Sequence, residues 1–143
     1  MAEGDAHVVN NFKEQLLLKT IDCDTDVFKV ALYSDAYASS QLDGAAPAYS
    51  ATNEIGPANY VAGGQSIGTP VVSQDDANDW AKWDDDGTDV TWNALGAATI
   101  LRAVLYDDTT ATKWLAIIWE IATNSNGGNY TLTFNANGMM TLG

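Results

Sequence analysis

The stretch 99–121 gathers the large apolar residues of this chain and constrains its fold more than any other. Two short apolar runs, 100–106 and 114–121, flank a polar connection at 107–112 that is too short to hold a helix. Two such runs joined by a polar turn predict a β-hairpin. Neither run alternates cleanly between apolar and polar residues, so both faces of each strand should be covered. The hairpin should therefore lie in the middle of a β-sandwich or barrel.

Arg102 is a cation inside this predicted hairpin. In registers that place residues of like parity opposite each other, Arg102 shares a face with Glu120, where the two side chains can pair. A partly buried ion pair of this kind would hold the strand register or a subunit contact. The favoured interpretation is instead an arginine at the edge of the core with its guanidinium in water, because long cationic side chains commonly bury the stem and solvate the head.

The segment 8–19 predicts a helix. Val8, Phe12 and Leu16 recur every four residues, as expected for one apolar helix face. A helix this short is marginal alone, so this face should pack on the sheet of its own chain or on a neighbouring subunit. We therefore divide the chain into an N-terminal arm and helix (1–20) and a single β domain (21–143).

The rest of the chain predicts short strands separated by turns. Strands are expected at 27–33, from 71 onward, at 90–92, at 130–134 and at 139–142, with glycine and asparagine in turns between them. The fold class is mainly β, an antiparallel β-sandwich or barrel-like domain with one N-terminal helix and about seven to nine strands. The segment 34–50 should be a long surface loop. Such loops are uncommon unless they have a function, such as contact with a partner, or are poorly ordered.

The chain carries 19 acidic and 6 basic residues, a net charge of −13. Such a surface repels phosphate backbones and anionic headgroups, so we expect no nucleic-acid partner. No apolar run approaches the length that spans a bilayer, so we expect no membrane partner. The first five residues lack the apolar region of a signal peptide, which predicts synthesis in a cytoplasm. The single cysteine, Cys23, excludes an internal disulfide and a cysteine-based zinc cluster.

A segment that begins with Asp75 and ends with Trp92 holds seven aspartates. An EF-hand alignment of this segment fails at both ends, because the first aspartate and the bidentate glutamate are missing. The favoured interpretation is a solvated acidic loop, with a weak calcium site as the alternative. The aspartates at 22, 24 and 26 likewise favour a turn over a calcium loop. We expect no cofactor.

Residues of the common catalytic sites are scarce. His7 is the only histidine, so a histidine-based triad is implausible. Cys23 has no basic neighbour in the sequence and is expected to be a small buried residue. Paired carboxylates and five tryptophans would suit hydrolysis of a glycoside, but a small sheet protein also needs aromatic residues to fill its core. We expect a protein that is not an enzyme.

Several motifs follow one another along nearly the whole chain: FKEQLL at 12–17, IDCDTDVFKVALY at 21–33, NE at 53–54, YVAGG at 60–64, DVTW at 89–92, RAVLYDD at 102–108 and GGNYTLTFNANG at 127–138. In this order they resemble a family of small tailed-bacteriophage virion proteins. The resemblance implies a β-rich head-decoration, or cement, protein that clamps capsid subunits from the outside, commonly as a trimer. The family has no catalytic residues to carry over. The chain departs from it in the tryptophan-rich strand at 114–119 and at Gly56 and Pro57.

From this resemblance we expect a structural protein on the outer capsid surface, made in the host cytoplasm, with the major capsid protein as partner and a homotrimer as the assembly. The residues expected at its interfaces are Val8, Phe12, Leu16, Tyr37, Tyr49, Arg102 and Glu120. The alternative is a carbohydrate- or receptor-binding β module of a phage tail fibre, with Trp80 and Trp83 as a stacking platform for sugars. Exposed, coplanar indoles would favour this alternative, and indoles buried in a core or interface would favour the cement protein.

Overall fold

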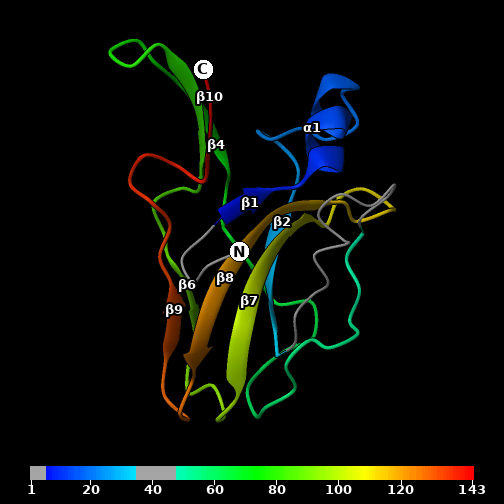
Figure 1. Cartoon of the computed structure of the whole chain (residues 1–143), viewed down its shortest axis with the longest axis vertical. Coiled ribbons are helices and arrows are strands. Elements are labelled where there is room, and N and C mark those ends of the chain that lie inside the picture. Colours follow the sequence, from blue (N-terminus) through cyan, green and yellow to red (C-terminus); the bar gives the residue numbers. More distant parts are fainter. Residues whose placement is uncertain (1–5, 35–47) are drawn as a thin grey trace.

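The computed structural model describes residues 6–34 and 48–143, and it is mainly β with one short helix near the N-terminus (Figure 1). This confirms the fold class expected from the sequence. In chain order the elements are β1 (Ala6–Val8), α1 (Asn10–Leu17), β2 (Phe28–Tyr33), β3 (Gln65–Ser66), β4 (Val71–Asp75), β5 (Trp80–Asp84), β6 (Val90–Trp92), β7 (Thr99–Asp107), β8 (Leu115–Asn124), β9 (Tyr130–Leu132) and β10 (Met140–Leu142). The described residues hold more strands than the seven to nine or so that turn spacing predicts, because elements as short as β3 leave no periodic pattern.

β7 and β8 form the predicted hairpin inside a five-stranded antiparallel sheet, in the order β1-β8-β7-β2-β3. Both strands are paired on both sides, and most of their side chains are buried, as the lack of clean alternation indicates. Arg102 pairs directly with Glu120. The register shifts twice along β7, which is typical of β-bulges.

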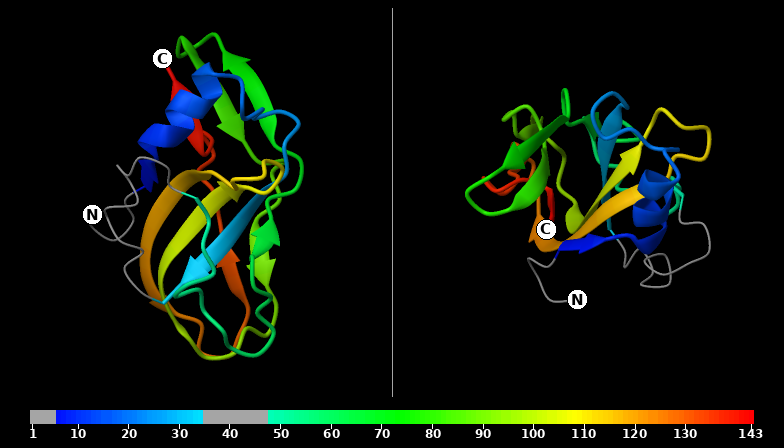
Figure 2. Two further views of the ribbon diagram at one scale, coloured as in Figure 1. Left: turned by 90° about the vertical axis from the view of Figure 1, so that its right-hand side faces the viewer. Right: turned by 90° about the horizontal axis from the view of Figure 1, so that it is seen from above.

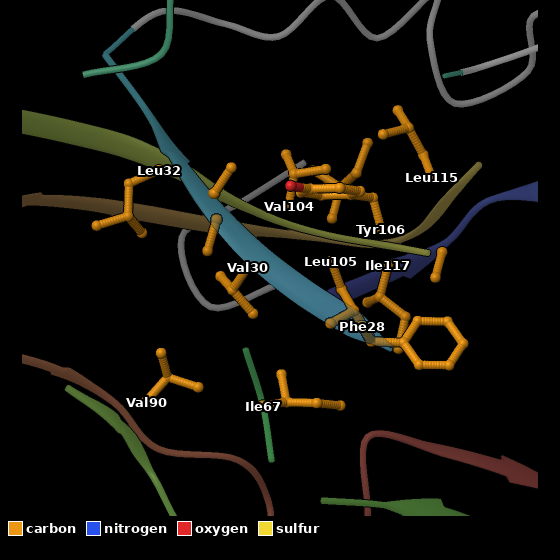
Figure 3. Close-up of a cluster of buried hydrophobic side chains, with 14 of the residues drawn as sticks. Phe28, Val30, Leu32, Ile67, Val90, Val104, Leu105, Tyr106, Leu115 and Ile117 are labelled. Carbon is orange, nitrogen blue, oxygen red and sulfur yellow. The ribbon is translucent and has the colours of Figure 1, made fainter. Parts of the chain in front are cut away.

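A two-stranded ribbon, β6 paired with β9, faces this sheet across the core, so the molecule is built like a β-sandwich (Figure 2). Buried apolar side chains from both layers meet between them (Figure 3). Those from the five-stranded sheet include Phe28, Val30, Leu105 and Ile117, and Val90 comes from the ribbon opposite. Ile67, which directly follows β3, is also buried in this cluster. Each such side chain contributes about 1.5–3 kcal/mol when it leaves water, so this cluster is the main source of stability.

One end of the molecule holds a three-stranded sheet, in the order β10-β5-β4, with α1 beside it (Figures 1 and 2). Phe12 of α1 is fully buried and stacks on Trp83 of β5, with ring centroids 5.4 Å apart. Phe28 of β2 meets the same indole edge-on at 4.8 Å. The helix therefore packs on its own chain, which is one of the two arrangements that the sequence leaves open.

β5 corrects the expectation of a solvated acidic loop from Asp75 to Trp92. Its residues form the middle strand of the three-stranded sheet, and Trp83 is only 2% exposed. The aspartates flank the strands, since Asp75 ends β4 and Asp84 ends β5. Charges at the ends of a short strand mask its apolar pattern. Lys82, which interrupts this pattern, forms an ion pair with Asp84 at 2.7 Å.

α1 is shorter at both ends than the predicted helix 8–19. Val8 belongs to β1, and the Val9 N–H donates to the Ala116 C=O at 2.9 Å. Pairing with β8 therefore holds these residues extended, although their spacing fits a helix. At the other end Lys19 has a φ of 59°, a left-handed conformation that commonly terminates helices.

Candidate interaction surfaces

Glu54 lies at the centre of a hydrogen-bond network on the five-stranded sheet. Its carboxylate accepts hydrogen bonds from the Tyr49 hydroxyl at 2.7 Å, from the Gly63 N–H at 2.8 Å and from the Tyr60 hydroxyl. Hydrogen bonds to an ionised acceptor are stronger than those between neutral groups. One side chain therefore ties together three points of the connection that precedes β3.

The same network reaches the strands of the sheet. The Leu32 N–H of β2 donates to the Tyr60 hydroxyl at 2.9 Å, and the Ile55 N–H donates to the Leu32 C=O at 2.9 Å. The Tyr106 hydroxyl of β7 donates to the Gly63 C=O at 2.8 Å. The edge of β2 beyond β3 is thus paired with a loop and a side chain, so it offers no free template for another strand.

The tyrosines of this network act as fixed hydrogen-bonding groups. The rings of Tyr49 and Tyr106 stack with centroids 4.3 Å apart, and Lys113 Nζ lies 5.9 Å from each centroid. Burial raises the pKa of Tyr60 and of Tyr106, so both hydroxyls stay protonated at neutral pH. We define the Glu54 network as Tyr49, Glu54, Tyr60, Gly63 and Tyr106.

Asp108, which directly follows β7, binds two lysines near the Glu54 network. Its carboxylate forms ion pairs with Lys29 Nζ of β2 at 2.6 Å and with Lys113 Nζ. Burial alone would raise the pKa of Asp108, but the hydrogen bonds and charges of Lys113 and Lys29 outweigh it and hold the pKa below its ordinary value. The carboxylate therefore stays ionised and links β2 to the β7–β8 turn.

Arg102 and Glu120 form an ion pair across β7 and β8, with the guanidinium Nη2 2.6 Å from the carboxylate Oε1. Arg102 is only 9% exposed, so the favoured expectation of an arginine head in water is wrong. The two residues are direct cross-strand partners beside a register shift, and their attraction opposes further slippage. Removing one partner of such a covered pair costs about 3–5 kcal/mol, because the other charge is left buried. Their role in a subunit contact stays a prediction.

The residues predicted at interfaces do not gather on one surface. In chain order they are Val8 (half-buried in β1), Phe12 (buried), Leu16 (half-buried), Tyr37 (outside the described residues), Tyr49 (half-buried), Arg102 (buried) and Glu120 (half-buried). Their interface role stays a prediction. Most of them serve the interior of this chain, because a large side chain at regular spacing is a signal of burial and does not say what covers it.

An apolar groove lies between α1 and the three-stranded sheet. Two adjoining hollows form it, of about 460 and 280 Å³. Its lining includes Leu16, Leu17, Val72, Ala81, Met140 and Leu142, and we call it the α1–β10 groove. Leu17 is 86% exposed and Leu142 59% exposed on its rim. Val8 and Leu16, two of the residues predicted at interfaces, also line this groove, and the sequence places Leu17 beside their stripe. Sequence reasoning did not predict the groove itself, because the proximity of α1 and β10 is long-range.

A third hollow, of about 620 Å³, lies where β8, β9 and β10 approach one another. Its wall includes the aromatic residues Trp80, Trp119, Tyr130 and Phe134. The rings of Trp119 and Phe134 are tilted, with centroids 5.6 Å apart. Trp83 is buried in the core, so the sugar platform of Trp80 and Trp83 that the sequence suggests does not form.

Aspartates near β4 and β6 cap turns. Asp75 accepts a hydrogen bond from Asn78 Nδ2 at 2.8 Å, and Asp86 accepts one from the Thr88 N–H at 3.0 Å. Hydrogen bonds, the largest from the side chains of Asn78 and Thr88, hold the pKa of Asp75 and of Asp86 below the ordinary value. Within residues 6–34 and 48–143, no group of three or more His, Cys, Asp or Glu is placed to hold a metal ion.

Comparison of the chain with profiles of known protein families, with curated proteins and with solved structures finds no match. The one helix in the described part of the chain is too short to cross a membrane. The resemblance to bacteriophage virion proteins therefore remains an expectation, and the function is inferred from the surfaces described above.

Proposed function

We propose that this chain is a structural virion protein that decorates and stabilises the outside of a bacteriophage capsid, as a cement protein does. The observation that carries the proposal is the Glu54 network, because four of its five members, all except Tyr49, come from three motifs of the resemblance: NE, YVAGG and RAVLYDD. The first two motifs are neighbours in the sequence, and the third joins them from about 40 residues away through the Tyr106–Gly63 hydrogen bond. Residues that a fold requires together are the ones that a shared architecture would retain, so the network supports a common fold behind the resemblance.

The chemistry of the polar groups supports a binding role and a protein that is not an enzyme. Glu54 accepts hydrogen bonds from three donors, and the charges of Arg102 and Glu120 are paired with each other. Burial, with smaller contributions from nearby aspartates, raises the pKa of Cys23 to about 12. Its thiol is therefore protonated at neutral pH, whereas the thiolate is the nucleophilic form.

The α1–β10 groove supports contact with a partner. Leu17 and Leu142 are exposed, and both line this groove in a chain of net charge −13. Exposed apolar surface of this kind marks sites of protein interaction. We infer the major capsid protein as the partner and a homotrimer as the assembly, because a symmetric oligomer on a local symmetry axis repeats identical contacts and gains avidity from them.

Addition of the purified protein to capsids that lack it tests this proposal. The wild-type protein should saturate the particles and raise their resistance to heat, and equilibrium sedimentation should give the mass of a trimer. Leu17→Glu should weaken capsid binding about tenfold or more, since it places a charge in an apolar contact. The matched control is Val61→Glu, which changes an exposed valine outside the groove. Failure of the wild-type protein to bind capsids contradicts the proposal.

A carbohydrate- or receptor-binding module of a tail fibre is the second candidate. The hollow lined by Trp80, Trp119, Tyr130 and Phe134 favours it. Sugar rings stack on indole and phenyl faces such as those of Trp119 and Phe134. Binding of oligosaccharides on a glycan array that Trp119→Ala abolishes and Leu17→Glu leaves intact would establish this function. Absence of any glycan binding by the wild-type protein would eliminate it.

A further inference from the structure

β4 is an open edge of the three-stranded sheet. It stands last in the order β10-β5-β4, pairs with β5 along its whole length without a register shift, and pairs with no other strand in the described part of the chain. Its residues 71–74 are exposed and uncharged. The edge of β2, by contrast, is covered by β3, Ile55 and Tyr60. A regular edge without an internal lysine, proline or bulge is a template for an added strand.

Carboxylates stand at both ends of this edge. One end carries Asp75, Asp76 and Asp79. At the other end Val71 pairs with Asp84, and the Asp86 carboxylate accepts a hydrogen bond from the Thr69 N–H at 3.4 Å. The cation of the neighbouring strand, Lys82, is already paired with Asp84. The edge is therefore an uncharged strand between two acidic ends.

Val72 gives this edge an apolar side. It is 49% exposed and aligns across the sheet with Trp83 and Met140, on the face toward α1. It also lines the α1–β10 groove together with Leu142. Successive side chains of a strand point to opposite faces, so an added strand would place every second side chain beside Val72. Apolar side chains at those positions would extend the buried surface of the groove.

We propose that β4 is a strand-addition site for an extended segment of a partner protein, with alternating apolar side chains at its centre and lysine or arginine at both ends. Main-chain hydrogen bonds to the free edge supply affinity, side chains beside Val72 supply selectivity, and the terminal cations pair with the aspartates. The inference deepens the proposed function, since it specifies the chemistry of the capsid segment that would bind.

A second copy of this chain is a poorer occupant of the same edge. Antiparallel pairing of β4 with itself places the Asp75 end of one copy against the Asp84 and Asp86 end of the other. Like charges at both ends then repel, and the net charge of −13 on each copy adds to this repulsion. A basic partner gains from the same charges.

Titration of the full-length protein with three synthetic peptides tests the site without any capsid. The probe is KKVTVTVKK, the charge control is EEVTVTVEE, and the strand control is KKVTPTVKK, whose central proline removes an amide donor. Nuclear magnetic resonance titration measures affinity, and amide hydrogen exchange locates the bound peptide. KKVTVTVKK should bind at least about tenfold more tightly than either control and should slow exchange in β4. Its affinity should fall with added salt.

Two variants test whether the peptide binds at the β4 edge or elsewhere on the surface. Val72→Lys places a lysine on the edge and should weaken KKVTVTVKK binding about tenfold, since it repels the cationic peptide and disfavours strand addition. Val61→Lys introduces the same charge at an exposed site outside β4 and should leave the affinity unchanged.

The proposal is overturned if no peptide binds, if the acidic peptide binds as well as the basic one, or if protection falls outside β4. It is also overturned if β4 is already protected in a concentration-dependent dimer of the free protein, since the occupant is then a second copy. Peptide binding at β4 by a protein that does not decorate capsids would contradict only the proposed function. Capsid decoration with no peptide binding at β4 would contradict only this inference.

Discussion

Glu54 shows at the scale of one residue how a polar side chain organises a loop. Its carboxylate accepts from two tyrosines and one backbone N–H, and one of those tyrosines also caps the edge of β2. The sequence contains these residues in motifs, but nothing in their spacing indicates that they meet. The hydrogen bonds of Glu54 span only five to nine residues, but contacts within an irregular loop leave no periodicity, so this network was not predictable from the sequence. The Arg102–Glu120 pairing, in contrast, was one of two interpretations that strand alternation allowed.

Glu54→Gln should lower the free energy of unfolding by about 2 kcal/mol, because a neutral amide replaces a charged acceptor and turns an N–H₂ group toward other donors. Urea unfolding followed by tryptophan fluorescence measures the loss. The control Glu14→Gln, on the exposed side of α1, should stay within about 0.5 kcal/mol of the wild type. Equal stability of the two variants would show that the network does not hold the loop.

Asp107 gives a pH dependence whose sign follows from its burial. Its carboxyl is fully covered, and burial raises its pKa above the ordinary value of 3.8 in spite of hydrogen bonds from Thr110 and Thr109. Between that value and the raised pKa the folded state binds more protons than the unfolded state. The free energy of unfolding attributable to this group therefore falls as the pH rises through this window, and the loss persists at neutral pH.

Asp107→Asn removes this titration while it keeps an acceptor for the Thr109 N–H, which lies 2.7 Å from Oδ1. The difference in unfolding free energy, variant minus wild type, should therefore increase from about pH 3 to about pH 7. Urea unfolding at a series of pH values measures this difference. A difference that is constant or falls with pH would mean that burial does not disfavour the ionised form of the Asp107 carboxyl.

At the scale of elements, strong local patterns were predictable and long-range pairings were not. The β7–β8 hairpin follows from two apolar runs around a turn, and β9 follows from alternation after an Asn/Gly turn. The four-residue spacing of Val8 and Phe12 predicts a helix from Val8. This prediction is wrong because the pairing of β1 with β8 outweighs that spacing. β5 was missed because the aspartates around it indicate a loop, whereas the burial of Trp83 decides the outcome.

Phe12→Ala tests whether α1 is part of the folded core. Its ring is fully buried against Trp83, so the variant should lose about 3–5 kcal/mol of stability. Leu17→Ala is the matched control on the same helix, and it should change stability by no more than about 0.5 kcal/mol because Leu17 is exposed. Thermal unfolding of both variants measures the two effects. Equal losses would place α1 outside the core.

Gly64→Ala tests the close approach of the glycine turn to β2. Gly64 has a φ of +71°, and an added Cβ would lie 1.8 Å from the Val30 carbonyl oxygen. Because that atom is backbone, the variant should lose more than about 4 kcal/mol or fail to fold. Gly87→Ala keeps the positive φ but meets open space, so it should cost only about 1–2 kcal/mol. Denaturant midpoints measure the two losses of stability. Equal midpoints for the two variants would contradict the close approach of Gly64 to Val30.

At the scale of the whole molecule, the three-stranded sheet and α1 lie at one end of the sandwich (Figure 2). This end carries the α1–β10 groove and the open edge of β4. The β class, the hairpin and the N-terminal helix were predictable, because each has its own sequence period. The groove was not, because it depends on how α1 and the three-stranded sheet sit together. The net charge of −13 was readable from composition alone, and it opposes non-specific association.

The central proposal is that this chain belongs to a bacteriophage virion, and a cryo-electron microscopy map of that virion tests it most directly. We predict density that fits residues 6–34 and 48–143 as trimers on the outer capsid surface, with the end that carries the α1–β10 groove turned toward the major capsid protein. Density for the chain on a tail fibre or on the inner capsid wall, or particles that lack it altogether, would contradict the proposal.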